Sequence, residues 1–140
     1  MASFTYQGPV KGQARPRFGQ RKIYDDKDSK AYKNTLKAAY MEQDGTKFAK
    51  GVPLVVYIHA FRPMPKKEPK RVVSVPWTVK PDADNIAKAV LDALNGAAWE
   101  DDAQVVRVMV WKHERTRDVV EGLRVFVDDA RLEGYTYEGF

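Results

Sequence analysis

The sequence contains no cysteine among its 140 residues, and it contains only two histidines. Without cysteine, the chain has neither a disulfide framework nor a metal site built on thiolates. It has no run of 18 apolar residues and no basic-then-apolar leader, so we expect a soluble protein of the cytoplasm. Apolar residues make up 44% of the chain, which is enough for one packed domain spanning residues 1–140.

Basic residues are in excess, and they are unevenly placed. The formal charge is +5, and residues 62–71 hold five Lys or Arg against one Glu. Such blocks attract polyanions, of which nucleic acid is the commonest, although a merely basic, soluble surface has the same composition. The predicted DNA contacts lie in two loops and beside the acidic centre described next: Lys11, Arg15, Arg17, Arg21, Lys22, Lys66, Lys67, Lys70, Arg71 and Lys80.

The acidic centre is the stretch of residues 80–106, which reads KPDADNIAKAVLDALNGAAWEDDAQVV. Its apolar residues recur at the i, i+3, i+4, i+7, i+8 spacing of one helix face. Asp84, Lys88 and Asp92 follow one another at single turns along the opposite face. Asp82 suits the helix start, and Asn95-Gly96 suits its end.

A second acidic pair, Asp101-Asp102, falls in the turn before an apolar stretch at residues 104–111. If that stretch is a strand that runs back beside the helix, the pair can approach Asp82 and Asp84. Carboxylates that close repel one another unless a cation neutralises them, and oxygen ligands alone favour Mg²⁺ or Mn²⁺. The alternative is that these are ordinary capping or solvated aspartates.

The combination of DxDNxxK, DAL and DDAQV, running from Asp82 to Val105, resembles the central motif of the RusA family of Holliday junction resolvases. These are small endodeoxyribonucleases, mostly of phages and prophages, so a phage-encoded member would act in the host cytoplasm. The resemblance is dense over residues 80–112. It implies a Mg²⁺-dependent homodimer that cuts branched DNA in recombination and repair, with Mn²⁺ as a substitute. It also implies Asp82, Asp84 and Asp102 as metal ligands and Lys88 as the essential lysine, and DDAQV favours Asp102 over Asp101.

The elements expected along the chain are strands at residues 3–7, 52–61, 104–111 and 120–128 and two main helices, at residues 30–43 and before Asn95. Their order, β-α-β-α-β-β, predicts an α/β (α+β) fold in two layers, with a mixed sheet of about four strands. Residues 52–61 are apolar on both faces, which indicates cover by helices or a second subunit on each side. We expect a mobile loop over residues 62–78 and a hairpin connection over residues 112–119.

The sequence therefore predicts a metal-dependent endonuclease with its site at the start of the second helix. Lys88 would neutralise charge on the phosphate or orient the attacking water, and Asn85 and Asp101 would support the ligands. A twofold dimer would supply two sites for two symmetric nicks. Two other interpretations stay open: a non-catalytic binder of branched or single-stranded DNA, and a nuclease for flap or duplex DNA.

Overall fold

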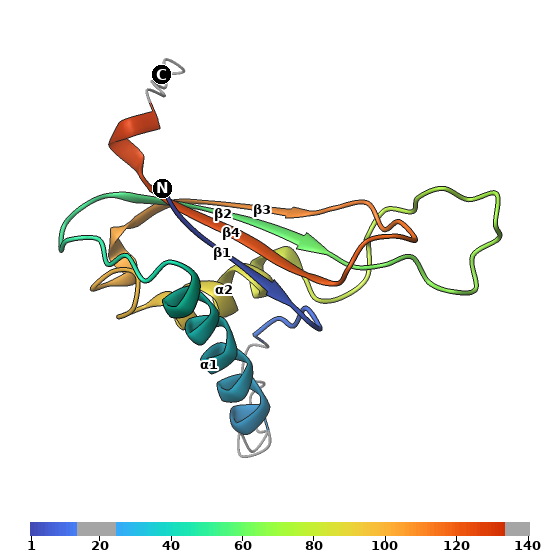
Figure 1. Ribbon diagram of the computed structural model, residues 1–140, viewed down its shortest axis with the longest axis horizontal. Coiled ribbons are helices and arrows are strands. Elements are labelled where there is room, and N and C mark those ends of the chain that lie inside the picture. Colours follow the sequence, from blue (N-terminus) through green and yellow to red (C-terminus); the bar gives the residue numbers. More distant parts are fainter. Residues whose placement is uncertain (14–24, 134–140) are drawn as a thin grey trace.

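Four strands form one mixed sheet, and two α-helices lie on one of its faces (Figure 1). The computed structural model describes residues 1–13 and 25–133. The elements are β1 (Ala2–Gln7), α1 (Asp25–Gln43), β2 (Leu54–Phe61), α2 (Ala83–Leu94), η1 (Asp102–Gln104), β3 (Val105–Lys112), β4 (Gly122–Asp129) and η2 (Ala130–Glu133). This confirms the predicted order of elements and the two-layer α+β class, although α1 begins at Asp25 and not at residue 30 as expected.

The strand order across the sheet is β1-β4-β2-β3. β4 is antiparallel to both β1 and β2, whereas β3 is parallel to β2. The hairpin expected between the last two strands is therefore wrong, because β2 lies between them. The physical reason is the crossover through α2, which returns the chain parallel to β2 and leaves the other side of β2 for β4.

The core lies between the sheet and the two helices. α2 buries the predicted stripe of Ile86, Ala89, Val90, Ala93 and Leu94, and it begins and ends where the sequence indicated. The helix-facing side chains of β2 are fully buried against this stripe. Burying each large aliphatic side chain contributes about 1.5–3 kcal/mol, so this apolar periodicity fixes where α2 sits.

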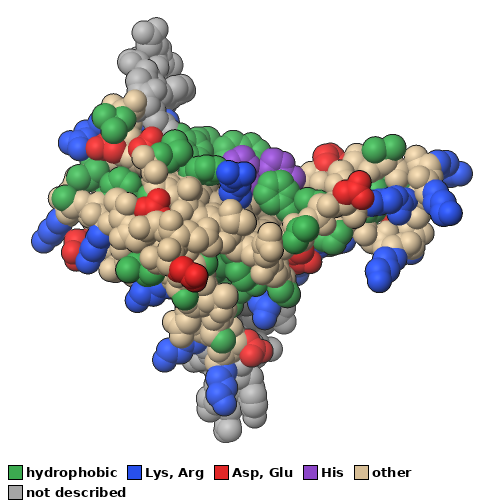
Figure 2. Space-filling model, in the orientation of Figure 1, with side chains coloured by type: hydrophobic (Ala, Val, Ile, Leu, Met, Phe, Trp, Pro, Cys, Tyr) green, Lys and Arg blue, Asp and Glu red, His purple; other side chains and the backbone are tan. Residues whose placement is uncertain are grey.

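Among the described residues, no helix lies on the opposite face of the sheet (Figure 1). Of the two kinds of cover expected for residues 52–61, helices are therefore present on one face only, and cover of the other face by a second subunit stays a prediction. Tyr57, His59 and Phe61 of β2 are only half-buried there. Their rings alternate with those of Trp111 and His113 in a stacked row, with neighbouring centroids 4.5–6.3 Å apart. Figure 2 shows the two histidines beside hydrophobic side chains on this surface.

A protrusion, here called the finger, extends beyond one end of the sheet (Figure 1). It consists of residues 63–76 and residues 113–118. The N–H of Met64 donates to the carbonyl of Thr116 at 2.9 Å, and Val75 pairs with Arg115. The Arg117 guanidinium donates to the carbonyl of Pro69 at 2.6 Å. The segment expected to be a mobile loop is thus held by backbone pairing. In the described ranges no helix has the length and apolar character needed to cross a bilayer.

Candidate active site

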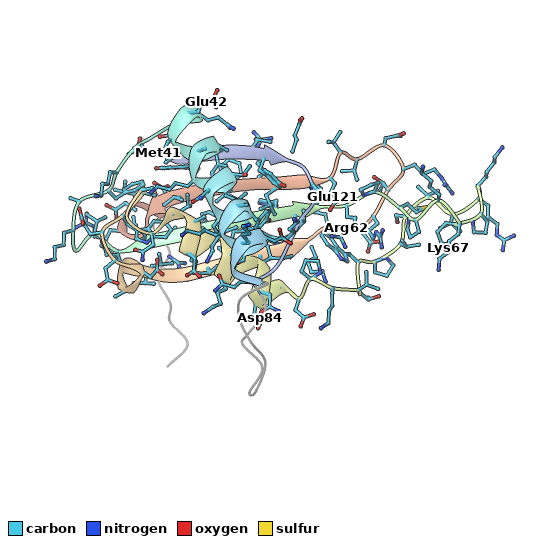
Figure 3. The ribbon with its side chains drawn as sticks, turned by 90° about the horizontal axis from the view of Figure 1, so that it is seen from below. Met41, Glu42, Arg62, Lys67, Asp84 and Glu121 are labelled. Atoms are coloured by element: carbon cyan, nitrogen blue, oxygen red, sulfur yellow. The ribbon has the colours of Figure 1, made fainter. Side chains whose placement is uncertain are left out.

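Two of the predicted ligands lie at the N-terminal end of α2. Asp82 is the N-cap residue, but its side chain makes no capping hydrogen bond, so the helix does not occupy its carboxylate. Asp84 lies in the first turn, and both side chains are exposed (Figure 3 labels Asp84). The positive end of the helix dipole stabilises negative charge at this position.

The third predicted ligand, Asp102, is held from behind by a buried tryptophan. The Nε1 of Trp99, which is fully buried, donates to Oδ1 of Asp102 at 2.8 Å. Burial raises the pKa of the Asp102 carboxyl, and the charges of Asp92 and Asp101 raise it further. The Trp99 hydrogen bond and the Lys88 charge act in the opposite direction. Asp102 therefore lies beside the charged face of α2 that carries Lys88 and Asp92.

Asp101 has a local structural use in the same turn. It is the N-cap of η1, and its Oδ1 accepts from the N–H of Ala103 at 3.0 Å. Gln104 completes the capping box and is itself buried, and its Nε2 donates to the carbonyl of Ala49 at 2.9 Å. These bonds fix the turn that presents Asp102. The choice of Asp102 over Asp101 as a ligand stays a prediction.

The predicted carboxylate ligands do not form a complete metal-binding site in this structure. Within residues 1–13 and 25–133, no group of three or more His, Cys, Asp or Glu side chains is placed to hold a metal ion. The donor chemistry nevertheless fits a hard divalent cation, because the side chains offer only carboxylate oxygens. A nearby cation would also offset the burial that raises the pKa of Asp102. The ligand set of Asp82, Asp84 and Asp102 stays a prediction.

Arg62, at the end of β2, ties together the segments around the Asp82 turn. Its Nη1 donates to the carbonyl of Lys80 at 2.9 Å, and its Nη2 donates to the carbonyl of Val10 at 3.0 Å. It also forms an ion pair with Glu121 at 3.3 Å, and that carboxylate accepts from the N–H of Val10 at 2.8 Å (Figure 3). The chain entering the turn is therefore fixed to the N-terminal segment and to the start of β4.

A second contact on this turn comes from Lys112, the last residue of β3. Its Nζ donates to the carbonyl of Val79 at 2.8 Å. Two cations lie over the ring of Trp77, with Arg62 Cζ 4.6 Å and Lys112 Nζ 5.1 Å from its centroid. Burial lowers the pKa of Lys112, while the Asp82 charge raises it. Lys112 thus couples the end of β3 to the turn that carries Asp82.

The predicted DNA contacts of the finger are exposed. Lys66, Lys67, Lys70 and Arg71 are all solvent-accessible. Figure 2 shows basic side chains gathered at the outer end of the finger, and Figure 3 labels Lys67 there. Lys80 is exposed beside the Asp82 turn. The finger and the acidic turn are joined directly by residues 77–81.

The other predicted basic contacts lie in the N-terminal segment. Lys11 is exposed, whereas Arg15, Arg17, Arg21 and Lys22 fall outside the described residues. The chain just before them lies against the start of α2, since the N–H of Gln13 donates to the carbonyl of Asn85 at 3.0 Å. A Cβ on Gly12 would lie 2.7 Å from the Asn85 Cβ and 2.9 Å from the Pro81 Cβ, so only glycine permits this close approach.

Sequence reasoning missed three residues of this site: Trp99, Arg62 and Lys112. The role of Trp99 could have been predicted from the sequence, because a buried indole N–H needs a hydrogen-bond partner and Asp102 follows three residues later. The roles of Arg62 and Lys112 could not have been predicted, because each donates to carbonyl groups of segments distant in the sequence.

Comparison with known proteins shows the family of the chain. The family model described as endodeoxyribonuclease RusA matches residues 7–128, a range that contains Asp82, Asp84, Lys88 and Asp102. The uncharacterized protein YqaN of Bacillus subtilis (strain 168) is 33% identical over 121 residues, which cover 78% of this chain and 84% of YqaN. The chain belongs to the RusA family of endodeoxyribonucleases, a family of Holliday junction resolvases.

Proposed function

We propose that this protein is a Mg²⁺-dependent endonuclease that resolves Holliday junctions by paired symmetric nicks. Family membership supports the reaction class. The observation that carries the proposal is the placement of Asp102, which Trp99 holds beside Lys88 on the face of α2 that begins at Asp84. That placement brings the Asp101-Asp102 turn beside the part of α2 that carries Lys88 and Asp92.

Asp82, Asp84 and Asp102 would hold the metal ion. When bound, Mg²⁺ polarises the scissile phosphate and lowers the pKa of a water molecule. The fixed end of this arrangement is Asp102, because the Trp99 hydrogen bond restricts its side chain. Asp82 and Asp84 are exposed and are the ligands whose side chains adjust.

The chain's own residues supply positioning and charge. Lys88 is one helical turn after Asp84 and is exposed, so its ammonium is available to neutralise charge on the phosphate in the transition state. Asp101 shapes the η1 turn, and the backbone carbonyl of Asn85 accepts a hydrogen bond from the N–H of Gln13 in the N-terminal segment. Each has a positioning role here.

DNA would be held by the basic residues on either side of this centre. The finger contributes Lys66, Lys67, Lys70 and Arg71, and Lys80 lies beside the Asp82 turn. Cations on both sides of a carboxylate cluster attract the phosphate backbone while leaving the centre for metal. Because one domain offers one site, we further propose that a homodimer makes the two nicks.

The test is cleavage of a synthetic four-way junction with Mg²⁺ by the wild type, Asp82→Asn and Lys88→Ala. We expect both variants to bind the junction nearly as the wild type does. Turnover should fall by about 100-fold or more, as for loss of a group that acts in the transition state. Asp28→Asn on α1, which removes an exposed carboxylate elsewhere, should cleave normally.

Two results would contradict the proposal. A wild type that binds the junction but leaves it intact with Mg²⁺ and Mn²⁺ would indicate a non-catalytic binder. Equal cleavage of the junction and of a competing linear duplex or flap would indicate a nuclease of broader substrate range.

A further inference from the structure

The finger carries the most exposed large apolar side chain in the described part of the chain. Val73 is 81% exposed, more than any other large hydrophobic residue there. Lys70 and Arg71 come shortly before it, and both are solvent-exposed. These cations attract a polyanion and disfavour an apolar protein surface. Because a phosphate offers an apolar side chain no partner, Val73 would contact the bases or sugars of a bound nucleic acid.

Two consecutive turns shape the part of the finger that leads to Val73. The N–H of Glu68 donates to the carbonyl of Pro65 at 3.2 Å, and the N–H of Val72 donates to the carbonyl of Pro69 at 3.0 Å. Each turn begins at a proline, whose ring fixes one backbone dihedral angle and so leaves the chain fewer alternatives. Val73 follows the second turn directly.

Arg117, on the other segment of the finger, holds both turns. Its Nη2 donates to the carbonyls of Glu68 at 3.3 Å, Pro69 at 2.6 Å and Val72 at 3.3 Å. A guanidinium carries five donors in a rigid fork, so a single arginine can bind several carbonyl groups at once. Val73 comes directly after the last of these carbonyls. It therefore loses little chain entropy when it contacts a ligand.

The base of the finger is also fixed, and it connects directly to the candidate active site. The N–H of Val75 donates to the carbonyl of Arg115 at 3.0 Å, and the N–H of Arg115 donates back to the carbonyl of Val75 at 2.8 Å. Trp77, which is buried, follows two residues later with two cations over its ring. The folded structure thus sets the position of Val73 relative to the Asp82 turn.

We propose that Val73 is an apolar wedge that inserts against unstacked bases at the branch point of the DNA, and that Arg117 is a positioning residue that keeps this wedge rigid. The inference rests on the proposed function and names the residue that selects branched DNA over linear duplex. An inserted apolar side chain must unstack a base step, and the cost is lowest where bases are already unpaired or unstacked. The base stack is interrupted at the point where strands exchange between the arms of a junction.

A four-way junction with a fluorescent adenine analogue at the branch point tests the wedge, because the emission of such a base rises when it is unstacked. The full-length protein is added in EDTA, so that no metal ion supports cleavage. We expect the emission to rise when the wild type binds, and to rise much less with Val73→Ser. Leu132→Ser is the matched control, because Leu132 in η2 is 76% exposed and lies outside the finger. It should behave as the wild type does.

Affinity provides the second measurement. Val73→Ser should lower the ratio of junction affinity to duplex affinity by about tenfold, the factor expected when one valine is no longer buried on binding. Its affinity for the linear duplex should be unchanged, because the cations of the finger hold the phosphates.

Arg117→Lys separates bracing from charge, because it keeps the cation and removes the fork of donors. We expect a smaller rise in emission than for the wild type, with an unchanged salt dependence of binding and an unchanged circular dichroism spectrum. A wild-type rise in emission with Arg117→Lys would overturn the positioning role.

Binding of the junction by the wild type without a rise in emission overturns the inference, and so does a rise that Val73→Ser leaves unchanged. Neither result bears on the proposed reaction, which cleavage of the unlabelled junction with Mg²⁺ judges separately. A wild type that gives the rise in emission but never cleaves would overturn the reaction and support the wedge, so the two failures are distinguishable.

Discussion

The indole Nε1 of Trp99 donates to Oδ1 of Asp102 at 2.8 Å, from a side chain that is fully buried between α2 and the sheet. A buried donor of this kind limits the rotation of the carboxylate it binds. Of the three predicted metal ligands, the one that lies outside the start of α2 is thereby held in place by the hydrophobic core. Trp77 offers the natural comparison, because it is also buried but its Nε1 has no hydrogen-bond partner among the described residues.

Trp99→Phe should weaken Mg²⁺ or Mn²⁺ binding by about 10–100-fold, the usual effect of removing a group that orients a ligand. Trp77→Phe removes the same atoms from a buried site without freeing Asp102, and should leave ion affinity near that of the wild type. Calorimetric ion titration, with thermal unfolding to report the packing loss in both variants, separates the two effects. Equal ion affinity in the two variants would contradict the orienting role of Trp99.

Arg62→Met should destabilise the fold by about 1–3 kcal/mol, because it leaves Glu121 and two carbonyl groups without their partner. It should also reduce junction cleavage, since the turn before Asp82 loses an anchor. Urea unfolding and cleavage assays measure the two effects. The control is Arg131→Met, which breaks an exposed pair with Asp129 and should leave stability nearly unchanged, because solvent screens a surface ion pair. Full rescue of the Arg62 defects by Arg62→Lys would contradict a role that depends on several directed bonds.

The chain's only two histidines, His59 and His113, meet at 2.7 Å between Nδ1 and Nε2, so one nitrogen donates and the other accepts. Burial lowers the pKa of His59, and the charges of His113 and of Arg124 on β4 lower it further. A lowered pKa means that the unfolded chain takes up the proton more readily. The free energy of unfolding should therefore fall as the pH drops below about 6.5 and through the lower folded-state value.

His113→Gln should move the His59 titration upward, towards its ordinary range, because the second imidazole no longer opposes protonation. Proton NMR of the remaining imidazole reports this directly. An unchanged or lower His59 pKa in the variant would show that His113 does not contribute to the lowered pKa of His59.

Replacing Lys66, Lys67, Lys70 and Arg71 with alanine should weaken junction binding and flatten its salt dependence. Each lost phosphate contact lowers the slope of log K against log salt by about 0.9. Replacing Lys47 and Lys50, which are exposed away from the finger, should leave the slope unchanged. Identical slopes for the wild type and the finger variant would show that the finger does not hold the phosphate backbone.

Local pattern predicted the elements well, because the physical cause of each is local. The apolar stripe of α2 and the glycine after Asn95 indicated both ends of that helix, and the apolar residues on both faces of residues 52–61 indicated a central strand, β2. The neighbour of β4 was not predictable in the same way. Strand order depends on contacts between segments far apart in the sequence, and here the α2 crossover reversed the expected pairing.

The acidic residues of the candidate site could be predicted for the same reason, since the spacing of a motif is a local property. The residues that hold these acidic residues in place could not be predicted. Arg62 bonds to Val10, Lys80 and Glu121, and no periodicity links those positions. The finger was expected to be a mobile loop because its prolines and basic residues predict no strand. Its pairing with residues 113–118 depends on carbonyl acceptors that the sequence does not reveal.

The most direct test of the central claim is Mn²⁺ binding, followed by electron paramagnetic resonance, for the wild type and for Asp82→Asn, Asp84→Asn and Asp102→Asn. We predict that each variant binds Mn²⁺ at least about tenfold more weakly than the wild type, and that Asp28→Asn does not. Wild-type Mn²⁺ affinity in all three variants would contradict the claim that these carboxylates share one cation.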